Sequence, residues 1–345
     1  MTEPTTGPPV GPTTGPPKTG RKALFVVGSG RSGTSALACS LQALGMHVPG
    51  PEVPADDTNP KGFGESQWVV DFHERMLRRA NVRMGDARPS AWLDTGRLDT
   101  VEKPREELLG WLREQVESQE RELVIKDPRA AWFLGLWRSA AMRLDVHASH
   151  AVMLRPPAEV VGSKEAYYSG AKIGPVTRAA SWVNLMLHTE RATRDTDRAF
   201  LSYHQLLDDW TEPVYQLGER FGLEAVRTAS AKELRQVHAF IDPSLHRVRT
   251  TWADLDVPHH LRELSDATWD ALSRLIDPAE DGPALHAELD ELRASYIRVY
   301  EEAEAIAESS VLAAQARRRK ADENAAQQAP EPVTRPGLMA RLRNR

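Results

Sequence analysis

Four short, mainly apolar runs recur along the chain. They are LFVVG at 24–28, ELVIK at 122–126, AVMLR at 151–155 and AFLSY at 199–203. A short continuous apolar run is typical of a strand that is buried on both faces of a sheet. The pattern therefore predicts four buried strands.

Longer stretches with apolar residues three or four positions apart separate these runs. In the stretch 66–79, Trp68, Phe72 and Met76 fall on one helical face, and Ser66 stands before them as an N-cap residue. Similar spacing predicts further helices at 35–44, 101–119, 158–168 and 178–196.

The alternation of apolar runs with helical stretches predicts an α/β fold, a central parallel β-sheet flanked by helices on both faces. Residues 256–316 keep a helical pattern and predict a helical C-terminal part. Ligands of open parallel sheets bind at the C-terminal ends of the strands. We therefore look for chemistry in the residues that follow each run.

The two ends of the chain differ from the part between them. Residues 1–20 hold six Pro, six Thr and four Gly, which predicts a disordered tail before a folded domain at 21–312. Residues 313–345 are rich in Ala, Gln and Arg and include the basic run 317–320, so we expect a second disordered tail. A basic end suits a weak peripheral contact with an anionic membrane surface, although a solvated tail is the favoured interpretation.

Composition restricts the function classes. The chain has 345 residues, of which 41% are hydrophobic and 27% charged, as in soluble globular proteins. No apolar run reaches the ~20 residues of a membrane span, and no secretory signal pattern is visible, so we expect a cytoplasmic protein. The single cysteine, Cys39, excludes an internal disulfide and a cysteine-based metal cluster, and the net charge of −5 gives no general case for nucleic-acid binding.

The stretch LFVVGSGRSGTSAL at 24–37 carries the most chemistry. Gly28, Gly30 and Gly33 spell G-x-G-x-x-G, and the same residues open a G-x-x-x-x-G nucleotide loop that continues Thr34-Ser35 instead of Lys-Ser/Thr. A strand that enters a helix through such a turn presents backbone N–H groups to an anion. A plain tight turn is the alternative.

Neither nucleotide pattern is complete. A dinucleotide site needs an acidic residue at the end of a second strand about 20 positions on. Glu52 stands at that distance, but prolines flank it. A nucleoside-triphosphate site needs the loop lysine for the β- and γ-phosphates, and Thr34 takes its place. A donor without a triphosphate–Mg²⁺ unit would explain the missing lysine.

The loop GRSGTS at 30–35 resembles the 5′-phosphosulfate loop of sulfotransferases that use 3′-phosphoadenosine 5′-phosphosulfate (PAPS). These enzymes read the 3′-phosphate with an Arg at a strand end and a Ser eight residues later, which Arg155 and Ser163 match here. The segment IKDPR at 125–129 and the stretch AFLSYHQLL at 199–207 are similar to further family segments. The resemblance covers roughly residues 22–250 and implies the P-loop-like sulfotransferase fold.

The resemblance also implies roles for individual residues. Lys126 would stabilise charge on the transferring group, Arg155 and Ser163 would bind the 3′-phosphate, and Tyr203 would lie near the adenosine. The 5′-phosphosulfate would lie in the loop formed by Gly30, Arg31, Ser32, Gly33, Thr34 and Ser35. The implied donor is PAPS, and no metal is required.

The general base stays open between three carboxylates. Members of the family with a Lys-Thr-His segment use its His as the base, but Pro128 takes that place here. Glu65, in a glycine-flanked loop, is the first candidate, Glu52 the second and Asp127 the third, since Asp127 could equally hold Lys126 in place.

The predicted function is sulfuryl transfer from PAPS to a hydroxyl of a carbohydrate, glycolipid or secondary-metabolite acceptor, and the oligomeric state stays open. Arg129 is either structural or a contact for an anionic acceptor, and His73 is expected on a helix surface or in a cleft wall. Two alternatives remain: an ATP-dependent small-molecule kinase with an atypical loop, and a non-catalytic interaction protein on a nucleotide-binding fold.

Overall fold

The structure is a computed structural model that describes residues 21–118, 120–168, 170, 173–241 and 249–328. The predicted N-terminal tail at 1–20 and residues 329–345 of the predicted C-terminal tail lie outside the described residues. So do residues 242–248, which belong to the stretch that the family resemblance covers.

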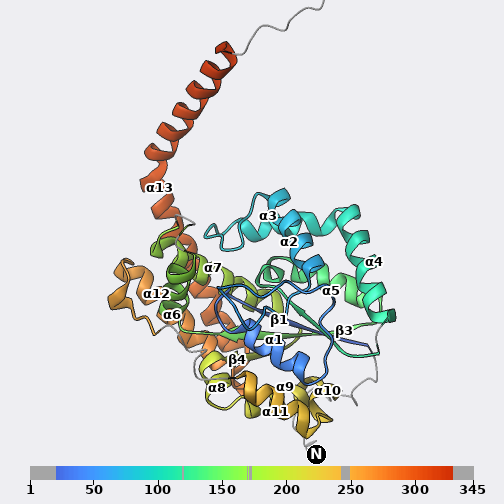
Figure 1. The fold of residues 1–345 in the computed structure, drawn as a ribbon. Coiled ribbons are helices and arrows are strands. Elements are labelled where there is room, and N and C mark those ends of the chain that lie inside the picture. Colours follow the sequence, from blue (N-terminus) through green and yellow to red (C-terminus); the bar gives the residue numbers. More distant parts are fainter. Residues whose placement is uncertain (1–20, 119, 169, 171–172, 242–248, 329–345) are drawn as a thin grey trace, which may run out of the picture. The chain divides into compact units, whose positions relative to one another are not determined.

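Four parallel strands form one sheet in the order β2-β1-β3-β4 (Figure 1). Their bounds are Lys22–Gly28 for β1, Leu123–Lys126 for β2, His147–Leu154 for β3 and Asp197–Ser202 for β4. The predicted strands and their parallel arrangement are therefore confirmed. Strand β3 begins four residues before the predicted run, because polar residues such as Ser149 and His150 interrupt its apolar pattern although both are buried.

Helices cover both faces of the sheet (Figure 1). On one face of the sheet, Leu24 and Val26 pack in a hydrophobic core with the helices of that face, which we call the first layer. The other face packs Phe25 against the indole of Trp137, with ring centroids 5.3 Å apart. Alternate residues of β1 thus face opposite layers, which explains why the strand reads as a continuous apolar run.

The helices of the first layer are α1 (Thr34–Ala43), α8 (Tyr203–Asp208), α9 (Thr211–Phe221), α10 (Glu224–Arg227) and α11 (Ala231–Phe240). On the opposite face lie α5 (Leu134–Arg143), α6 (Pro157–Tyr167), α7 (Pro175–Thr193) and α12 (His259–Arg274).

Three further helices and one 3₁₀ turn pack around α5 and η2 (Pro128–Phe133), the 3₁₀ turn that follows β2. They are α2 (Gln67–Ala80), α3 (Ala91–Gly96), α4 (Glu102–Ser118) and the 3₁₀ turn η1 (Arg97–Thr100). Two short 3₁₀ turns, η5 (Trp252–Asp254) and η6 (Pro278–Glu280), flank α12. The five helices predicted before residue 200 correspond to α1, α2, α4, α6 and α7.

The C-terminal part is helical, as predicted, and ends in α13 (Pro283–Gln328). By compactness the chain divides after Ile297 into two units. The expected disordered tail from residue 313 differs from the structure over 313–328, which continue α13. Alanine is the strongest helix former, so this Ala-rich stretch can extend a helix even though the side chains at 313–324 face water. In the described part of the chain, no helix combines the length and apolar character that crossing a bilayer requires.

Candidate active site

The order of the strands in the sheet determines where the candidate site lies. The chain leaves the central strand β1 for β2 on one side and later returns to β3 on the other. Such a reversal opens a crevice at the C-terminal ends of the strands, where ligands of these sheets bind. The glycine loop, Lys126 and Arg155 all stand at these ends.

The loop between β1 and α1 needs its glycines for steric reasons. Gly28 has φ +136°, and a Cβ there would lie 2.7 Å from the carbonyl oxygen of Met153. Gly33 has φ +89°, and a Cβ there would lie 2.3 Å from the Tyr203 ring. Arg31 adopts φ +75° without being glycine, a backbone strain of the kind found at binding sites. The loop therefore packs closely against the Met153 backbone and the Tyr203 ring. The N-terminus of α1, which the loop leads into, is accessible to a ligand.

Lys126 compensates in space for the lysine that the loop lacks. It ends β2, is 3% exposed, and its ammonium donates to the Ser35 hydroxyl at 2.9 Å. The same ammonium forms a buried ion pair with the carboxylate of Glu65. Strand pairing therefore places a cation beside the loop that the loop sequence itself does not contain.

Glu65 is the predicted base that the structure brings to Lys126. Its carboxylate is buried and lines the cavity. Lys126 contacts its Oε1, whereas its Oε2 has no hydrogen-bond partner among the described residues. Burial raises the pKa of Glu65 above its usual range, although the Lys126 ammonium opposes the rise. A carboxylate with a raised pKa and a free oxygen is suited to accept a proton.

Glu52 lies elsewhere. Its side chain is exposed and accepts a hydrogen bond from Gln42 at 2.7 Å. Its backbone bridges that of Ser66, so Glu52 and Glu65 stand on neighbouring antiparallel segments. Only Glu65 of the two lines the cavity described below.

Asp127 is fully buried and organises the turn η2. Its carboxylate accepts from the backbone N–H and the guanidinium of Arg129 at 3.0 and 2.9 Å and from His73 Nδ1 at 2.8 Å. Burial alone would raise the pKa of Asp127, but the His73 hydrogen bond and the Arg129 charge outweigh it and lower the pKa to about 2. Asp127 therefore holds the segment after Lys126 in position and does not line the cavity.

His73 is buried, which differs from the expected helix surface or cleft wall. The indole N–H of Trp137 can only donate, so His73 Nε2 accepts from it at 2.8 Å and Nδ1 carries the proton given to Asp127. Helical spacing alone misplaced His73, because α2 also packs against η2, whose Phe133 stacks on the imidazole.

We expect Asp127→Asn to lower the free energy of unfolding by about 1.5–3 kcal/mol, since it removes the charge of a fully buried carboxylate that accepts three hydrogen bonds. The folded pKa lies below the unfolded value. The contribution of Asp127 is therefore complete above roughly pH 4 and is lost as pH falls toward 2.

Urea unfolding between pH 7 and 3 measures the difference in the free energy of unfolding between wild type and the Asp127 variant. This difference should shrink on acidification, whereas exposed Asp270→Asn should cause little change at any pH. A difference that is small at pH 7 would contradict the role of Asp127.

Arg155 and Ser163 both contact the glycine loop through Arg31. The Arg155 guanidinium donates to the carbonyl of Arg31 at 3.1 Å and lies over the Tyr203 ring, 4.6 Å from its centroid. The Ser163 hydroxyl accepts from Arg31 Nε at 3.1 Å. Glu159 fixes Arg155 Nε at 2.9 Å. Burial opposes ionisation of Glu159, but hydrogen bonds from His204 and Arg155 lower its pKa to about 2.

Lys164 is a site residue that the sequence analysis missed. Its ammonium donates to the Ser29 hydroxyl at 3.0 Å, at the start of the glycine loop. Burial lowers the pKa of Lys164 to about 8, and the charge of Arg178 adds to the effect. Its position directly after Ser163, in a chain with few lysines, was the available signal.

These side chains surround one cavity of about 520 Å³. Ten of the predicted site residues line it: Gly30, Arg31, Gly33, Thr34, Ser35, Glu65, Lys126, Arg155, Ser163 and Tyr203. Ser32 does not; it is buried, and its hydroxyl has no partner among the described residues. Within the described ranges, no cluster of three or more His, Cys, Asp or Glu side chains could hold a metal ion.

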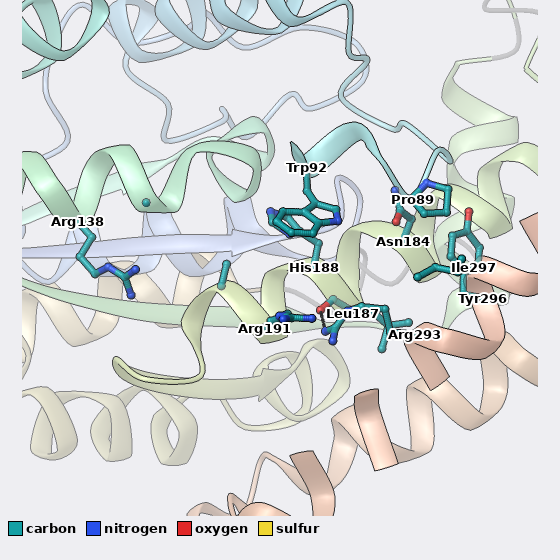
Figure 2. Close-up of a pocket in the computed structure, with 12 residues that line it drawn as sticks. Pro89, Trp92, Arg138, Asn184, Leu187, His188, Arg191, Arg293, Tyr296 and Ile297 are labelled. Carbon is teal, nitrogen blue, oxygen red and sulfur yellow. Dashed lines mark hydrogen bonds between the residues drawn. The ribbon is translucent and has the colours of Figure 1, made fainter. Parts of the chain in front are cut away.

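A second cavity, of about 250 Å³, lies between α3, α5, α7 and the start of α13 (Figure 2). The indole of Trp92 stacks on His188 there, with ring centroids 6.2 Å apart, and burial lowers the pKa of His188 to about 4. No residue of the glycine loop lines it. The larger cavity is therefore the candidate active site.

Comparisons with known proteins give two solved structures of similar fold. One is the sulfotransferase domain of the olefin synthase of Synechococcus PCC 7002, with 16% identity, a TM-score of 0.43, and coverage of 74% of this chain and 97% of that domain. The other is a sulfotransferase domain from the curacin biosynthetic pathway, with 16% identity, a TM-score of 0.42, and coverage of 73% and 98%. No protein-family model and no curated protein matches the chain. The function proposed below therefore rests on the residues of the site.

Proposed function

We propose that the protein is a PAPS-dependent sulfotransferase of the cytoplasm that transfers the sulfuryl group to an acceptor hydroxyl of a carbohydrate, glycolipid or secondary metabolite. The observation that carries the proposal is one cavity lined by two groups of residues suited to bind anions. The glycine loop with Lys126 is the first group, and Arg155 with Ser163 is the second. A donor that carries a phosphosulfate and a separate phosphate could use both groups.

The chain would perform the transfer mainly by positioning and charge stabilisation. Backbone N–H groups at the start of α1 hold the phosphosulfate, and Lys126 stabilises the negative charge that grows on the departing phosphate oxygen. The acceptor oxygen bonds to sulfur as the bond from sulfur to that phosphate oxygen breaks. Glu65 takes the acceptor proton, so the products are the sulfated acceptor and adenosine 3′,5′-bisphosphate.

The kinase alternative has less support from the cavity. Mg²⁺ prefers oxygen ligands, above all carboxylates, in kinase and ATPase sites. Among the described residues that line this cavity, Glu65 supplies the one carboxylate, and Lys126 already pairs with it. The arrangement therefore favours a donor whose charge is balanced by basic side chains.

A thermal-shift titration tests the proposal. Adenosine 3′,5′-bisphosphate at 100 times its Kd should stabilise the protein by ~2.7 kcal/mol, which for a domain of this size raises Tm by roughly 4–5 °C. Ser163→Ala should weaken this shift, because it removes a hydroxyl that the proposal assigns to the 3′-phosphate. ATP with Mg²⁺ and NAD serve as comparison ligands.

The possible results separate the three candidate functions. A shift with the bisphosphate, followed by release of bisphosphate from PAPS in the presence of an acceptor, supports the sulfotransferase. A shift with ATP and Mg²⁺ alone would favour the kinase. No shift with any of the three ligands would favour a non-catalytic interaction protein.

A further inference from the structure

The charge of the active-site cavity is far from balanced. Of the residues that the structure describes, one carboxylate, Glu65, lines it together with seven basic side chains: Arg31, Arg83, Lys126, Arg129, Arg155, Lys164 and Arg178. Concentrated positive charge in a cavity attracts anions and raises their local concentration. The excess of positive charge therefore favours anionic ligands in the cavity.

A donor with two phosphate-type groups accounts for only part of this charge. PAPS carries about four negative charges, because a phosphate monoester contributes nearly two and the phosphosulfate about two more. Four basic side chains contact the loop or its neighbour Ser163: Arg31, Lys126, Arg155 and Lys164. Arg83, Arg129 and Arg178 remain for another purpose.

Two of these three arginines already have protein partners. Arg178 donates to the carbonyls of Ile173 and Tyr168 at 3.0 and 2.9 Å and pairs with Glu165. Arg129 pairs with Asp127 and with Glu74. Their charges are at least partly compensated within the fold.

Arg83 differs from both. Its side chain is exposed and lines the cavity, and no hydrogen bond or ion pair of its guanidinium occurs among the described residues. Yet its backbone is firmly held, because its N–H donates to Asp86 at 3.1 Å. Arg83 lies in the segment that joins α2 to α3 (Figure 1).

The neighbours of Arg83 are anchored as well. The carbonyl of Met84 accepts from the Trp132 indole at 3.0 Å, and the carbonyl of Gly85 accepts from the Ser181 hydroxyl at 2.8 Å. These bonds tie the segment to η2 and to α7, both of which contribute residues to the lining of the cavity. A fixed backbone thus presents an uncompensated guanidinium to the cavity, and a guanidinium is suited to bind a carboxylate or phosphate in a bidentate manner.

We propose that the acceptor carries an oxyanion, a carboxylate or a phosphate, which Arg83 binds while the acceptor hydroxyl faces Glu65. Arg129, whose charge also acts on Glu65, adds positive charge to the lining of the same cavity. This inference rests on the proposed function, since it assigns the glycine loop, Lys126, Arg155 and Ser163 to the donor. It defines the acceptor as an anionic hydroxy compound.

The first experiment needs no knowledge of the acceptor. Wild type, Arg83→Ala and Arg79→Ala are saturated with adenosine 3′,5′-bisphosphate and titrated with inorganic phosphate or acetate at constant ionic strength, with Tm as the readout. Arg79 is an exposed arginine of α2 that does not line the cavity, so its variant is the matched control. We expect a further rise in Tm for wild type and Arg79→Ala that is much reduced in Arg83→Ala.

The second experiment measures transfer with matched acceptor pairs. 3-Hydroxybutyrate and 4-hydroxyphenylacetate are each compared with their methyl esters, and glucose 6-phosphate with glucose. The anionic member should have the higher kcat/KM, and Arg83→Ala should raise its KM roughly tenfold, more than that of the neutral member. The carboxylate and phosphate pairs distinguish the two kinds of oxyanion.

The outcomes separate the two levels of the proposal. Failure of the bisphosphate to bind contradicts the proposed function itself. Bisphosphate binding without an Arg83-dependent effect of phosphate or acetate overturns the assignment of Arg83 alone. A preference for the neutral members of the acceptor pairs would overturn the anionic acceptor.

Discussion

Replacing Glu65 with glutamine is expected to lower kcat by roughly 10²–10⁴-fold, the usual contribution of a general base. Glutamine has nearly the same shape, and its Oε1 can still accept from Lys126, so the ion pair becomes a hydrogen bond without loss of packing. Because the change removes proton acceptance and little else, binding of adenosine 3′,5′-bisphosphate should stay within a few-fold of wild type.

The pH dependence of kcat/KM gives a second signature of this base. The deprotonated carboxylate is the active form, so the rate falls as pH decreases through the pKa of Glu65. Burial raises that pKa above its ordinary value of 4.5, which moves the fall to higher pH than an exposed glutamate would show. In Glu65→Gln this acidic limb should be absent.

Glu52→Gln is the matched control, because Glu52 is an exposed glutamate on the neighbouring segment. Its kcat and its pH profile should equal those of wild type. Loss of transfer in the Glu52 variant with full activity in the Glu65 variant would move the base to Glu52.

Replacing Lys126 with alanine should lower kcat by roughly 10²–10³-fold, the usual cost of losing one donor aimed at developing charge. Binding of the bisphosphate product should change little, since Arg155 and Ser163 hold its phosphate and the loop N–H groups remain. Single-turnover kinetics with PAPS and titration calorimetry with the bisphosphate separate the two effects.

The variant should also shift the pH profile. The Lys126 ammonium now opposes the rise in the pKa of Glu65, so its removal should move the acidic limb to still higher pH. Lys103→Ala, at an exposed lysine of α4, is the control for loss of a positive charge. Unchanged turnover in Lys126→Ala would show that Lys126 has only a structural role.

Local interactions are what the sequence revealed well. The four apolar runs predicted the strands, because a strand buried on both faces leaves no polar alternation. The glycines of the loop marked a turn that only glycine fits, as the positive φ of Gly28 and Gly33 shows. Arg155 and Ser163 line the same cavity, since eight residues from a strand end into the next helix leave little freedom in their placement, and their binding of a phosphate stays a prediction.

The sequence by itself thus determined the α/β fold class, the glycine loop between the first strand and the first helix, and the candidates for the base. Only the tertiary structure separated Glu65 from Glu52, because burial and the pairing with Lys126 join segments 61 positions apart. It also turned Asp127 toward His73 and left Arg83 facing the cavity without a partner in the described chain. The physical reason is that charge, desolvation and pKa depend on contacts across the fold, which neither periodicity nor spacing along the chain records.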